Sequence, residues 1–519
     1  MSEYREWSRR TRRTLDGVMD EETRYEAVAS RDARFDGAFF FAVETTGIYC
    51  RPSCPAVTPK RKNVRFYPTA AAAQGSGFRA CRRCRPDAVP GSAEWNVRAD
   101  VVGRAMRMIG DGVVDREGVP GLAGRLGYSA RQVQRQLAAE LGAGPVALAR
   151  AQRAHTARTL LQTTVLPVTE IAFAAGFASV RQFNDTIRQI YARTPSGLRA
   201  ESGNGMSGMS GRSGTSGRRG MNGGRNRSGT SRTSTTGERL PTAPSLAGIP
   251  LRLAYRGAYA AREMFDLLAD EAVPSVEEVI GEPGARAYRR TLRLPHGPGV
   301  VSVDESLPAT GAAAGARSGW LEARIHLTDL RDLTTAVGRL RRLLDLDADP
   351  YAVDERLAAD PLLAPLVAAR PGLRAPGTAD PEEYALRVHV GPAEARRLVA
   401  AYGETVERPC GGLTRLFPAP AALVDDAVAG PLATALAAGT VRLDAGASRD
   451  EAERALLTVP GVTARTAALV RMRGLGDPDV APPAPDGGPG RAAWRPWRSY
   501  AAWHLKVRAG QAVSSSPQL

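Results

Sequence analysis

The alternation of hydrophobic and polar positions divides the chain into regions with different secondary structure. The apolar run FFFAVETTGIY, which begins at Phe39, predicts a strand. From about Val97 to Arg199 apolar residues recur with the period of a helix, and from about Leu246 short strands alternate with helices. We therefore expect a multidomain protein, mainly α, that also contains α+β structure.

Two segments of the helical region have the pattern of a helix-turn-helix unit. In the first, VPGLAGRLGYSARQVQRQLAAELG, apolar residues stand at helical spacing on both sides of Gly127, and Ser129 predicts the N-cap of the next helix. In the second, VTEIAFAAGFASVRQFNDTIRQIYARTPSGLR, Gly176 and Ser179 take the equivalent places. The second helix of such a unit enters the major groove with its N-terminal side chains near the base edges.

Either segment alone also fits an ordinary helical hairpin. Two in tandem, ending in TPSGLR, resemble the AraC/XylS family of transcription regulators. This resemblance implies binding to promoter DNA and action on RNA polymerase. We expect the DNA contacts to come from the second helix of each unit and its cap: Ser129, Arg131, Gln132, Arg135, Arg181, Gln182, Asn184 and Arg188.

The segment between the helical region and the next strands is dominated by Gly, Ser, Thr, Asn and Arg, at residues 201–240. Because large apolar side chains are nearly absent, it cannot bury enough surface to offset the entropy cost of ordering. It predicts a disordered basic linker that adds nonspecific contacts to DNA phosphates. The arginine-rich residues 1–20 predict a flexible N-terminus.

Length and charge narrow the class of protein. At 519 residues the chain is too long for one hydrophobic core, so three or four domains are expected. The formal net charge of +16 fits a nucleic acid or an anionic membrane surface as the partner. There is no apolar run long enough to cross a membrane and no secretory signal, so we expect a cytoplasmic, nucleoid-associated protein that binds double-stranded DNA.

Four of the five cysteines form two closely spaced pairs, Cys50 with Cys54 and Cys81 with Cys84. Two such pairs can close a tetrahedral zinc site, whereas the alternative of two disulfides is disfavoured in a reducing cytosol. Spacing alone favours a structural site, although a zinc-bound thiolate can remain nucleophilic. Basic residues near the cysteines indicate a polyanionic partner: Arg51, Lys60, Arg61, Lys62, Arg65, Arg79, Arg82, Arg83 and Arg85.

The runs TTGIYCRPSC and GFRACRRCRPD resemble the N-terminal domain of the Ada family of DNA alkylation-response proteins, over roughly residues 20–90. The resemblance implies that Cys50 accepts a methyl group from a methyl phosphotriester in alkylated DNA. It also implies that Cys54, Cys81 and Cys84 bind Zn²⁺ together with Cys50. Methylation turns a thiolate into a neutral thioether, so the affinity for DNA should rise.

The C-terminal half resembles the AlkA family of 3-methyladenine DNA glycosylases. The alternating strands and helices after Leu246 resemble the N-terminal α+β domain of that family. LLTVPGVTARTAALVRMRGLGDPDV, residues 456–480, resembles its helix-hairpin-helix, in which a Pro-Gly turn, here at Gly461, meets a DNA phosphate. WRPWRSYAAWHL, residues 494–505, resembles its closing helix. The implied activity is excision of alkylated purines that have been flipped out of the duplex.

Three departures from the AlkA pattern bear on that activity. Thr463 and Arg465 replace a glycine and an aromatic residue of the hairpin, and a β-branched residue fits poorly where φ is positive. Residues 380–404 look shorter than their counterparts and lack the G-Q-x-V-S turn. Most of the helix that should carry the catalytic aspartate is missing, so Asp486 is the nearest positional candidate and Asp479 a weaker one.

Aromatic residues of the closing helix, among them Trp497, could stack on a base, but Tyr500 and Trp503 stand at a spacing more typical of a core. The fifth cysteine, Cys410, lacks a P-C-H-R context, which excludes an O6-methylguanine methyltransferase domain.

Two functions stay open at this point. The first is a bifunctional protein that repairs methyl phosphotriesters, activates transcription and excises alkylated purines. The alternative is a DNA-binding regulator whose glycosylase-like half is catalytically inactive. The expected divisions are a flexible N-terminus (1–20), a zinc domain (21–90), a helix-turn-helix domain (97–200), a linker (201–240), an AlkA-like N-terminal domain (246–370) and a helix-hairpin-helix domain (371–510).

Overall fold

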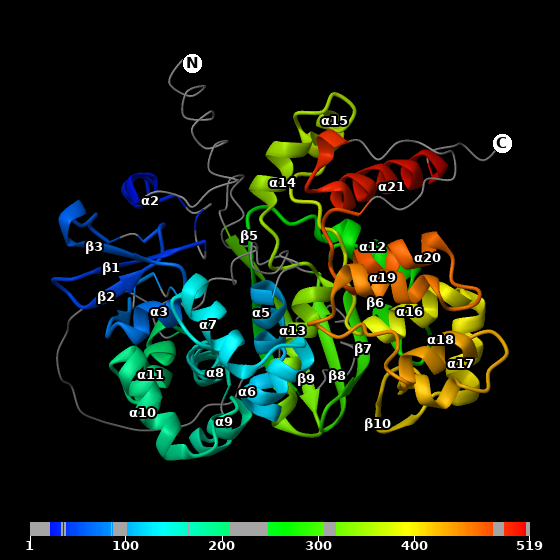
Figure 1. The fold of residues 1–519 in the computed structure, drawn as a ribbon, viewed down its shortest axis with the longest axis horizontal. Helices are drawn as coiled ribbons and strands as arrows, with labels where there is room; N and C mark the ends of the chain where they lie inside the picture. The colour runs from blue at the N-terminus through cyan, green and yellow to red at the C-terminus, as the bar shows by residue number, and fades with distance from the viewer. Residues whose placement is uncertain are drawn as a thin grey trace, which may run out of the picture.

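The computed structural model describes most of the chain in several stretches (Figure 1). These are residues 21–32, 35, 38–54, 56–81, 83–84, 86, 101–164, 166–206, 248–305, 318–480 and 492–514. The predicted flexible N-terminus lies outside the described residues, as do residues 207–240 of the predicted linker. We call residues 21–206 the regulatory half and residues 248–514 the glycosylase-like half.

The first region is a four-stranded sheet with short helices. Its elements are α2 (Glu21–Ala29), β1 (Phe40–Val43), β2 (Ile48–Cys50), η2 (Arg61–Asn63), β3 (Val64–Tyr67), α3 (Ala70–Gly75) and β4 (Arg79–Ala80). The strand order is β3-β1-β2-β4, with β2 and β4 parallel. The prediction of one strand over FFFAVETTGIY is therefore wrong, because the chain reverses between β1 and β2. Gly47, with a φ of 63°, supplies the left-handed residue that this turn requires.

Seven helices are described between residues 101 and 206, and they contain both predicted helix-turn-helix units. They are α5 (Val101–Gly110), α6 (Val113–Leu126), α7 (Ala130–Leu141), α8 (Pro145–Thr163), α9 (Val168–Ala174), α10 (Val180–Tyr191) and α11 (Pro195–Met206). Gly118, with a φ of 68°, and Pro120 kink α6 near its middle. α11 continues to Met206, six residues into the segment predicted as a linker.

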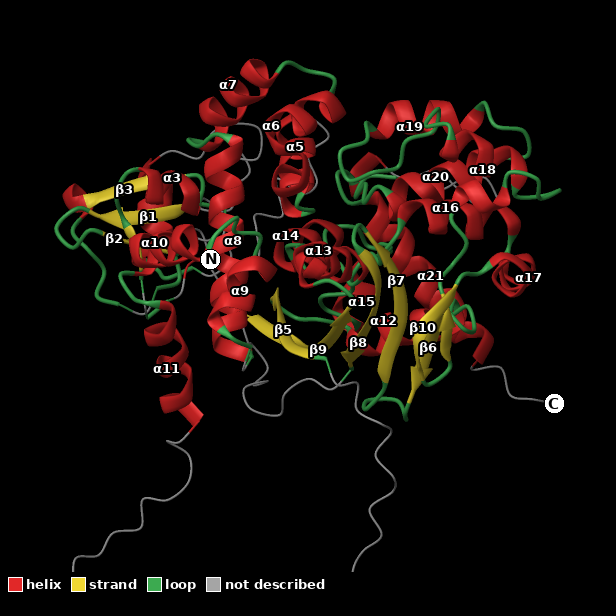
Figure 2. Ribbon diagram, turned by 90° about the horizontal axis from the view of Figure 1, so that it is seen from below, coloured by secondary structure: helices red, strands yellow, loops and turns green. Residues whose placement is uncertain are grey.

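The glycosylase-like half begins with a five-stranded antiparallel sheet, in the order β5-β9-β8-β7-β6 (Figure 2). The elements of this part are β5 (Ile249–Arg256), α12 (Ala261–Asp270), β6 (Glu277–Ile280), β7 (Ala287–Leu294), β8 (Gly297–Asp304), β9 (Ser318–Leu327), η5 (Leu330–Asp332), α13 (Leu333–Leu343), α14 (Pro350–Leu357) and α15 (Ala364–Ala369). Alternate residues of β5, namely Leu251, Leu253 and Tyr255, are buried, as expected for a strand with one face on the core.

The remainder is largely helical, and it includes a short hairpin that the sequence did not predict. Its elements are α16 (Pro381–Val390), α17 (Pro392–Tyr402), β10 (Thr405–Cys410), β11 (Leu413–Arg415), η6 (Pro420–Leu423), α18 (Gly430–Ala437), α19 (Arg449–Leu457), α20 (Ala464–Leu469), η7 (Val470–Gly474), η8 (Ala492–Trp494) and α21 (Arg498–Ser514). None of the described helices is long and apolar enough to cross a membrane.

The two halves pack against each other. One hydrophobic core includes Tyr49 from the zinc region, Phe183 from the second helix-turn-helix and Tyr288 from the large sheet. On α5, Arg104 and Arg107 donate hydrogen bonds to the carbonyls of Gly446 at 2.5 Å and Ala445 at 2.9 Å. A cavity of about 1180 Å³, lined by residues of both halves, remains between them. The regulatory and glycosylase-like regions therefore form one body rather than separate units on a tether.

Candidate zinc centre and DNA interface

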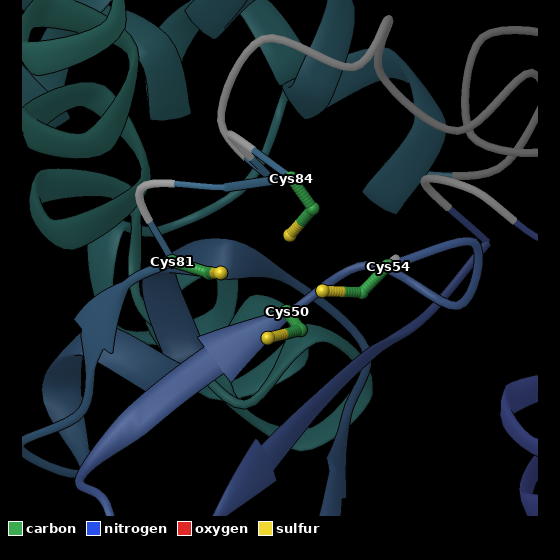
Figure 3. A group of neighbouring side chains, drawn as sticks. All are labelled: Cys50, Cys54, Cys81 and Cys84. Atoms are coloured by element: carbon green, nitrogen blue, oxygen red, sulfur yellow. The ribbon is translucent and has the colours of Figure 1, made fainter. Parts of the chain in front are cut away.

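The four paired cysteines converge on one point, although they come from separate segments (Figure 3). Cys50 ends β2, and Cys81 directly follows β4. Because Tyr49 pairs with Ala80 across these parallel strands, the residues that follow them lie side by side. A turn closed by the hydrogen bond from the Cys54 amide to the Arg51 carbonyl, 3.0 Å long, returns Cys54 to the same place.

The geometry of the four sulfurs fits zinc. All four Sγ atoms lie within 4.8 Å of one another. A tetrahedral zinc ion with bonds of about 2.3 Å separates its sulfur ligands by roughly 3.8 Å, so a small contraction of the cluster completes the site. The four cysteines are free thiols, which excludes the two disulfides considered as an alternative. The prediction of a four-cysteine zinc site is confirmed.

Burial and mutual proximity make the cluster unfavourable as an isolated set of thiolates. Each of the four cysteines is 4–7% exposed. Hydrogen bonding to Cys54 and burial raise the pKa of Cys50, whereas hydrogen bonding to Cys50 lowers the pKa of Cys81. A divalent cation offsets the repulsion among four ionised sulfurs, so the donor set is suited to a metal ion. Among the described residues no second cluster of metal-binding side chains comes together in this way.

The basic side chains near the cysteines divide into paired and exposed groups. Arg61 forms an ion pair with Glu21 at 2.6 Å, and Arg65 pairs with Glu44. Lys60, Lys62 and Arg83 are exposed. Arg82 and Arg85 lie outside the described residues. The zinc region therefore presents some, but not all, of its positive charge to solvent.

The first helix-turn-helix unit forms as the sequence predicted. The apolar residues at helical spacing are buried: Leu122, Leu126, Val133 and Leu137. Ser129 caps α7 and forms a capping box with Gln132, in which the Gln132 side chain accepts from the Ser129 backbone N–H at 3.0 Å. Arg131 and Arg135 are exposed on the same helix. The Gln132 carbonyl oxygen is thus occupied by the cap, while the two arginines are accessible to a DNA duplex.

The second unit has the same construction. Ser179 caps α10 by accepting a hydrogen bond from the Gln182 amide at 3.2 Å. Arg181, Gln182 and Arg188 are exposed, and Asn184 is partly buried. α10 also contacts β4 of the zinc region, so the second recognition helix packs directly beside the metal-binding sheet.

The helix-hairpin-helix is formed by α19, the turn around Gly461, and α20. Gly461 is exposed and has a φ of 82°, which a residue with a side chain rarely adopts. Thr463 has a φ of −87° and caps α20 by accepting from the Thr466 amide at 3.1 Å. The expected conflict between a β-branched residue and the turn is therefore absent, because the left-handed position belongs to Gly461. Nearby, α16 and α17 meet at Gly391 without a longer turn.

The carboxylates that follow the hairpin are held by arginines. Asp479 accepts from Arg498 at 2.7 Å, and Asp477 accepts from Arg471 at 2.7 Å. Asp477 is buried and Asp479 is half-buried. Asp486 lies outside the described residues. Both described aspartates therefore hold the chain after the hairpin in place.

The aromatic residues of the closing helix belong mainly to the core. Trp494, Tyr500 and Trp503 are 5–7% exposed. The Trp494 indole N–H donates to Asp360, and the Tyr500 hydroxyl donates to Asp345 at 2.8 Å. These bonds tie η8 and α21 to the α13–α15 region. The burial of Tyr500 and Trp503 agrees with their helical spacing.

The sequence did not single out a group of charged side chains near the hairpin. Lys506 of α21 lies 3.8 Å from Glu271, which also binds Arg473 at 2.9 Å. Glu271 follows α12, more than two hundred residues before Lys506. The one sequence signal was composition, because the other two lysines, Lys60 and Lys62, lie in the zinc region.

Comparisons with known proteins agree with the order of these regions. Three family models match: the metal binding domain of Ada (residues 23–87), a helix-turn-helix domain (122–201) and the AlkA N-terminal domain (250–380).

Individual relatives match either the whole chain or one of its halves. A probable bifunctional transcriptional activator/DNA repair enzyme AlkA of Mycobacterium tuberculosis is 46% identical, covering 96% of this chain and 98% of the relative. DNA-3-methyladenine glycosylase 2 of Escherichia coli is 28% identical, covering 48% of this chain and 93% of the relative. The crystal structure of a methylated N-Ada/DNA complex is 35% identical with a TM-score of 0.13, covering 26% of this chain and 99% of that one. The chain therefore belongs to the family of bifunctional transcriptional activator/DNA repair enzymes AlkA.

Proposed function

We propose that the chain repairs methyl phosphotriesters in DNA at Cys50 and that the repaired state activates transcription. The observation that carries this proposal is the convergence of four buried cysteine sulfurs, with Cys50 at the end of β2 and first in the run CRPSC. The basic surface around the cluster supports a DNA phosphate as the group that approaches it.

The proposed transfer is a displacement at carbon. Cys50 Sγ attacks the methyl carbon of the phosphotriester, and an S–C bond forms as the O–C bond breaks. The electron pair of the broken bond stays on the phosphate oxygen, which becomes a normal phosphodiester. Bound zinc keeps its sulfur ligands deprotonated at neutral pH while leaving a thiolate able to attack. Because the thioether product is stable, each chain accepts one methyl group.

Methylation also changes the formal charge of the zinc centre that faces the DNA. A zinc ion with four thiolates carries a formal charge of minus two, and a thioether in place of one thiolate reduces it to minus one. Repulsion of the DNA backbone falls, so affinity rises. The contact between α10 and β4 supports a direct effect on DNA reading, because the second recognition helix adjoins the zinc-binding sheet.

We propose that α7 and α10 read promoter DNA in successive turns of the major groove. Arg131, Arg135, Arg181 and Arg188 are exposed on these helices, in positions that can reach phosphates or base edges. Gln182 and Asn184 add amide groups on α10, and Ser129 and Gln132 fix the start of α7. Activation then requires contact with RNA polymerase, and the site of action is the nucleoid in the cytoplasm.

For the glycosylase-like half we propose excision of alkylated purines, with Asp486 as the catalytic carboxylate. The exposed turn at Gly461 supports docking of a DNA phosphate. Asp477 and Asp479 are engaged by arginines, which leaves Asp486 as the candidate by position.

A second function for this half is DNA affinity without chemistry. Two observations favour it. The aromatic side chains Trp494, Tyr500 and Trp503 are used in the core, and Arg465 stands exposed where the family has an aromatic residue. An arginine near the hairpin adds a contact to a DNA phosphate.

Methyl transfer is tested by incubating the full chain with duplex DNA that carries methyl phosphotriesters, followed by peptide mass spectrometry. The expected adduct is a single methyl group on Cys50, absent in Cys50→Ser. Cys410→Ser is the matched control and should accept the methyl group normally. Zinc content measured on each variant separates loss of the nucleophile from loss of the fold. A methyl group on another cysteine of the wild type would contradict the assignment.

The glycosylase is tested by release of 3-methyladenine from alkylated duplex DNA. Wild type should release the base, and Asp486→Asn should lose most of this activity. Asp425→Asn, which changes an exposed carboxylate elsewhere in the same domain, is the control. If wild type releases no base, the half is a DNA-binding module, and the affinity function replaces the catalytic one.

A further inference from the structure

The sequence of the glycosylase-like half contains a single lysine, Lys506. Of the 70 basic residues in the chain, three are lysines: Lys60 and Lys62 in the zinc region and Lys506 on α21 (red in Figure 1). A lysine amine can lose its proton and attack a carbonyl carbon, whereas an arginine guanidinium stays protonated. Lys506 is thus the one side chain of this half able to form an imine.

Lys506 is held between an aromatic face and a carboxylate. Its Nζ atom lies 4.7 Å from the centre of the Trp503 ring and 3.8 Å from Glu271 Oε1. Trp503 is 7% exposed, so one side of the amine is covered by protein. The Lys506 side chain nevertheless keeps 61% of its surface exposed, which leaves the other side open to a ligand.

The carboxylate beside Lys506 is itself fixed. Glu271 Oε1 accepts a hydrogen bond from Arg473 Nη1 at 2.9 Å, and the Glu271 backbone carbonyl accepts one from Arg387. Arg473 is buried, so Glu271 cannot swing away without breaking the ion pair of that guanidinium. Desolvation lowers the pKa of Lys506 below its ordinary value, and the positive charges of Arg473 and Arg465 act in the same direction. The nearby carboxylates of Glu271 and Asp270 oppose this shift.

The amine also lies near the surface expected to meet DNA. Arg465 is exposed in the first turn of α20, and the phosphate-binding turn at Gly461 comes just before it. Arg473, which binds the same carboxylate as Lys506, belongs to η7, and η7 directly follows α20 of the hairpin. A duplex held by the hairpin therefore brings its sugar-phosphate backbone close to the amine.

We propose that Lys506 gives the glycosylase-like half a second activity, cleavage of DNA at abasic sites. The proposal rests on the proposed docking of this half on DNA, but it does not require excision of a base by the same chain. The ligand is the ring-opened aldehyde of an abasic deoxyribose, which is a carbonyl carbon exposed in the backbone of the duplex.

The reaction balances without an oxidant or a reductant. The neutral Lys506 amine attacks C1′ of the aldehyde, and loss of one water gives an imine. A proton then passes from C2′ to solvent water, the C3′–O bond breaks, and the 3′-phosphate departs with the electron pair. One water hydrolyses the imine and returns the amine. The products are an unsaturated aldehyde on one strand end and a 5′-phosphate on the other. Glu271 positions the amine and is the nearest acceptor for its proton.

The test uses a duplex with one preformed abasic site and sodium borohydride, which reduces the imine to a stable secondary amine. Wild type should become linked to the DNA, and Lys506→Arg, which keeps the charge, should lose about tenfold or more of this product. Arg408→Lys, which adds an exposed amine on β10 of the same half, is the matched control and should match wild type. Mass spectrometry should find the adduct on the tryptic peptide of residues 499–508.

A second variant tests the role assigned to Glu271. Glu271→Gln removes the negative charge that raises the pKa of the amine, so trapping should reach half its maximum at a lower pH than in wild type. A merely structural role would lower the yield without moving this midpoint.

The outcomes separate this proposal from base excision, because the abasic site is supplied ready-made. Loss of trapping in Lys506→Arg together with strand cleavage by wild type supports the lyase even if no 3-methyladenine is released. Absence of trapping by wild type, or equal trapping by Lys506→Arg and wild type, overturns it. An adduct on Lys60, Lys62 or the N-terminal amine alone also overturns it.

Discussion

The zinc region and the helix-hairpin-helix region encode their sites in different ways. In the zinc region, four cysteines within one short stretch bring their sulfurs within 4.8 Å of one another. In the glycosylase-like half the described helices pack around the hairpin, while Asp477 and Asp479 behind it are bound to arginines. A metal site is thus specified by ligand spacing, whereas a glycosylase fold is specified by core residues that carry no chemistry.

The largest expected difference between these regions is their dependence on metal. Removal of zinc with a chelator, or Cys84→Ala, should unfold residues 21–86, because binding of a structural zinc contributes on the order of 10–16 kcal/mol of folding free energy. Zinc content and protease sensitivity of this region measure the effect. The glycosylase-like half should stay folded, and Cys410→Ser should change neither quantity. A zinc region that stays resistant to protease without metal would contradict the proposed difference between the two regions.

The glycosylase-like half should depend instead on buried hydrogen bonds, and Arg374 is its strongest example. This side chain is 1% exposed and donates to the carbonyls of Ala348, Arg256 and Ala258 at 2.6–3.1 Å. Arg374→Met leaves these carbonyls without a donor, so the free energy of unfolding should fall by about 3–5 kcal/mol. Chemical denaturation measures the loss, and zinc content should not change. A loss below about 1 kcal/mol would show that the carbonyls find other partners.

His504 should make the stability of the glycosylase-like half sensitive to acid. It is 1% exposed, and burial lowers its pKa from 6.5 to about 4. Between these values the unfolded chain binds a proton that the folded chain does not, so stability falls as pH decreases from about 6.5 towards 4. The loss from this group approaches about 3 kcal/mol. The free energy of unfolding of wild type should fall by more than that of His504→Leu across this window, and parallel pH profiles would contradict the assignment.

The smallest expected effect concerns the contact between the two halves. Arg104→Ala removes a hydrogen bond to the Gly446 carbonyl, and a bond from a charged donor contributes about 1.5–3 kcal/mol. The halves should separate more readily, which small-angle scattering detects as an increase in the radius of gyration. Arg408→Ala, a change at an exposed arginine of β10, is the control. An unchanged radius would mean that the remaining contacts, among them the hydrogen bond from Arg107 to Ala445, hold the halves together without Arg104.

The sequence predicted the features that depend on nearby residues. The two cysteine pairs, the caps at Ser129 and Ser179 and the glycine of the hairpin all follow from short spacing or local backbone geometry. The predicted conflict at Thr463 was wrong because the left-handed residue of that turn is Gly461.

Features that depend on tertiary contacts could not be predicted in this way. Arg104 binds the Gly446 carbonyl, which lies 342 positions later in the chain. Lys506 is positioned by Glu271, which follows a different helix, α12. Asp479 is likewise bound by Arg498, and a resemblance to a family motif does not predict this contact. The FFFAVETTGIY hairpin was missed because the polar turn ETTG between its two apolar segments was counted as part of one strand.

The central claim is that a methyl group on Cys50 turns repair into tighter DNA binding. The most direct measurement compares the affinity of the full chain for one duplex at fixed salt, before and after methylation by phosphotriester DNA, with Cys50→Ser treated in parallel. Affinity of the wild type should rise at least about threefold at low salt, with a smaller gain at high salt, because one negative charge is lost near the phosphates. Unchanged affinity after methylation, or an equal gain in Cys50→Ser, would contradict the account.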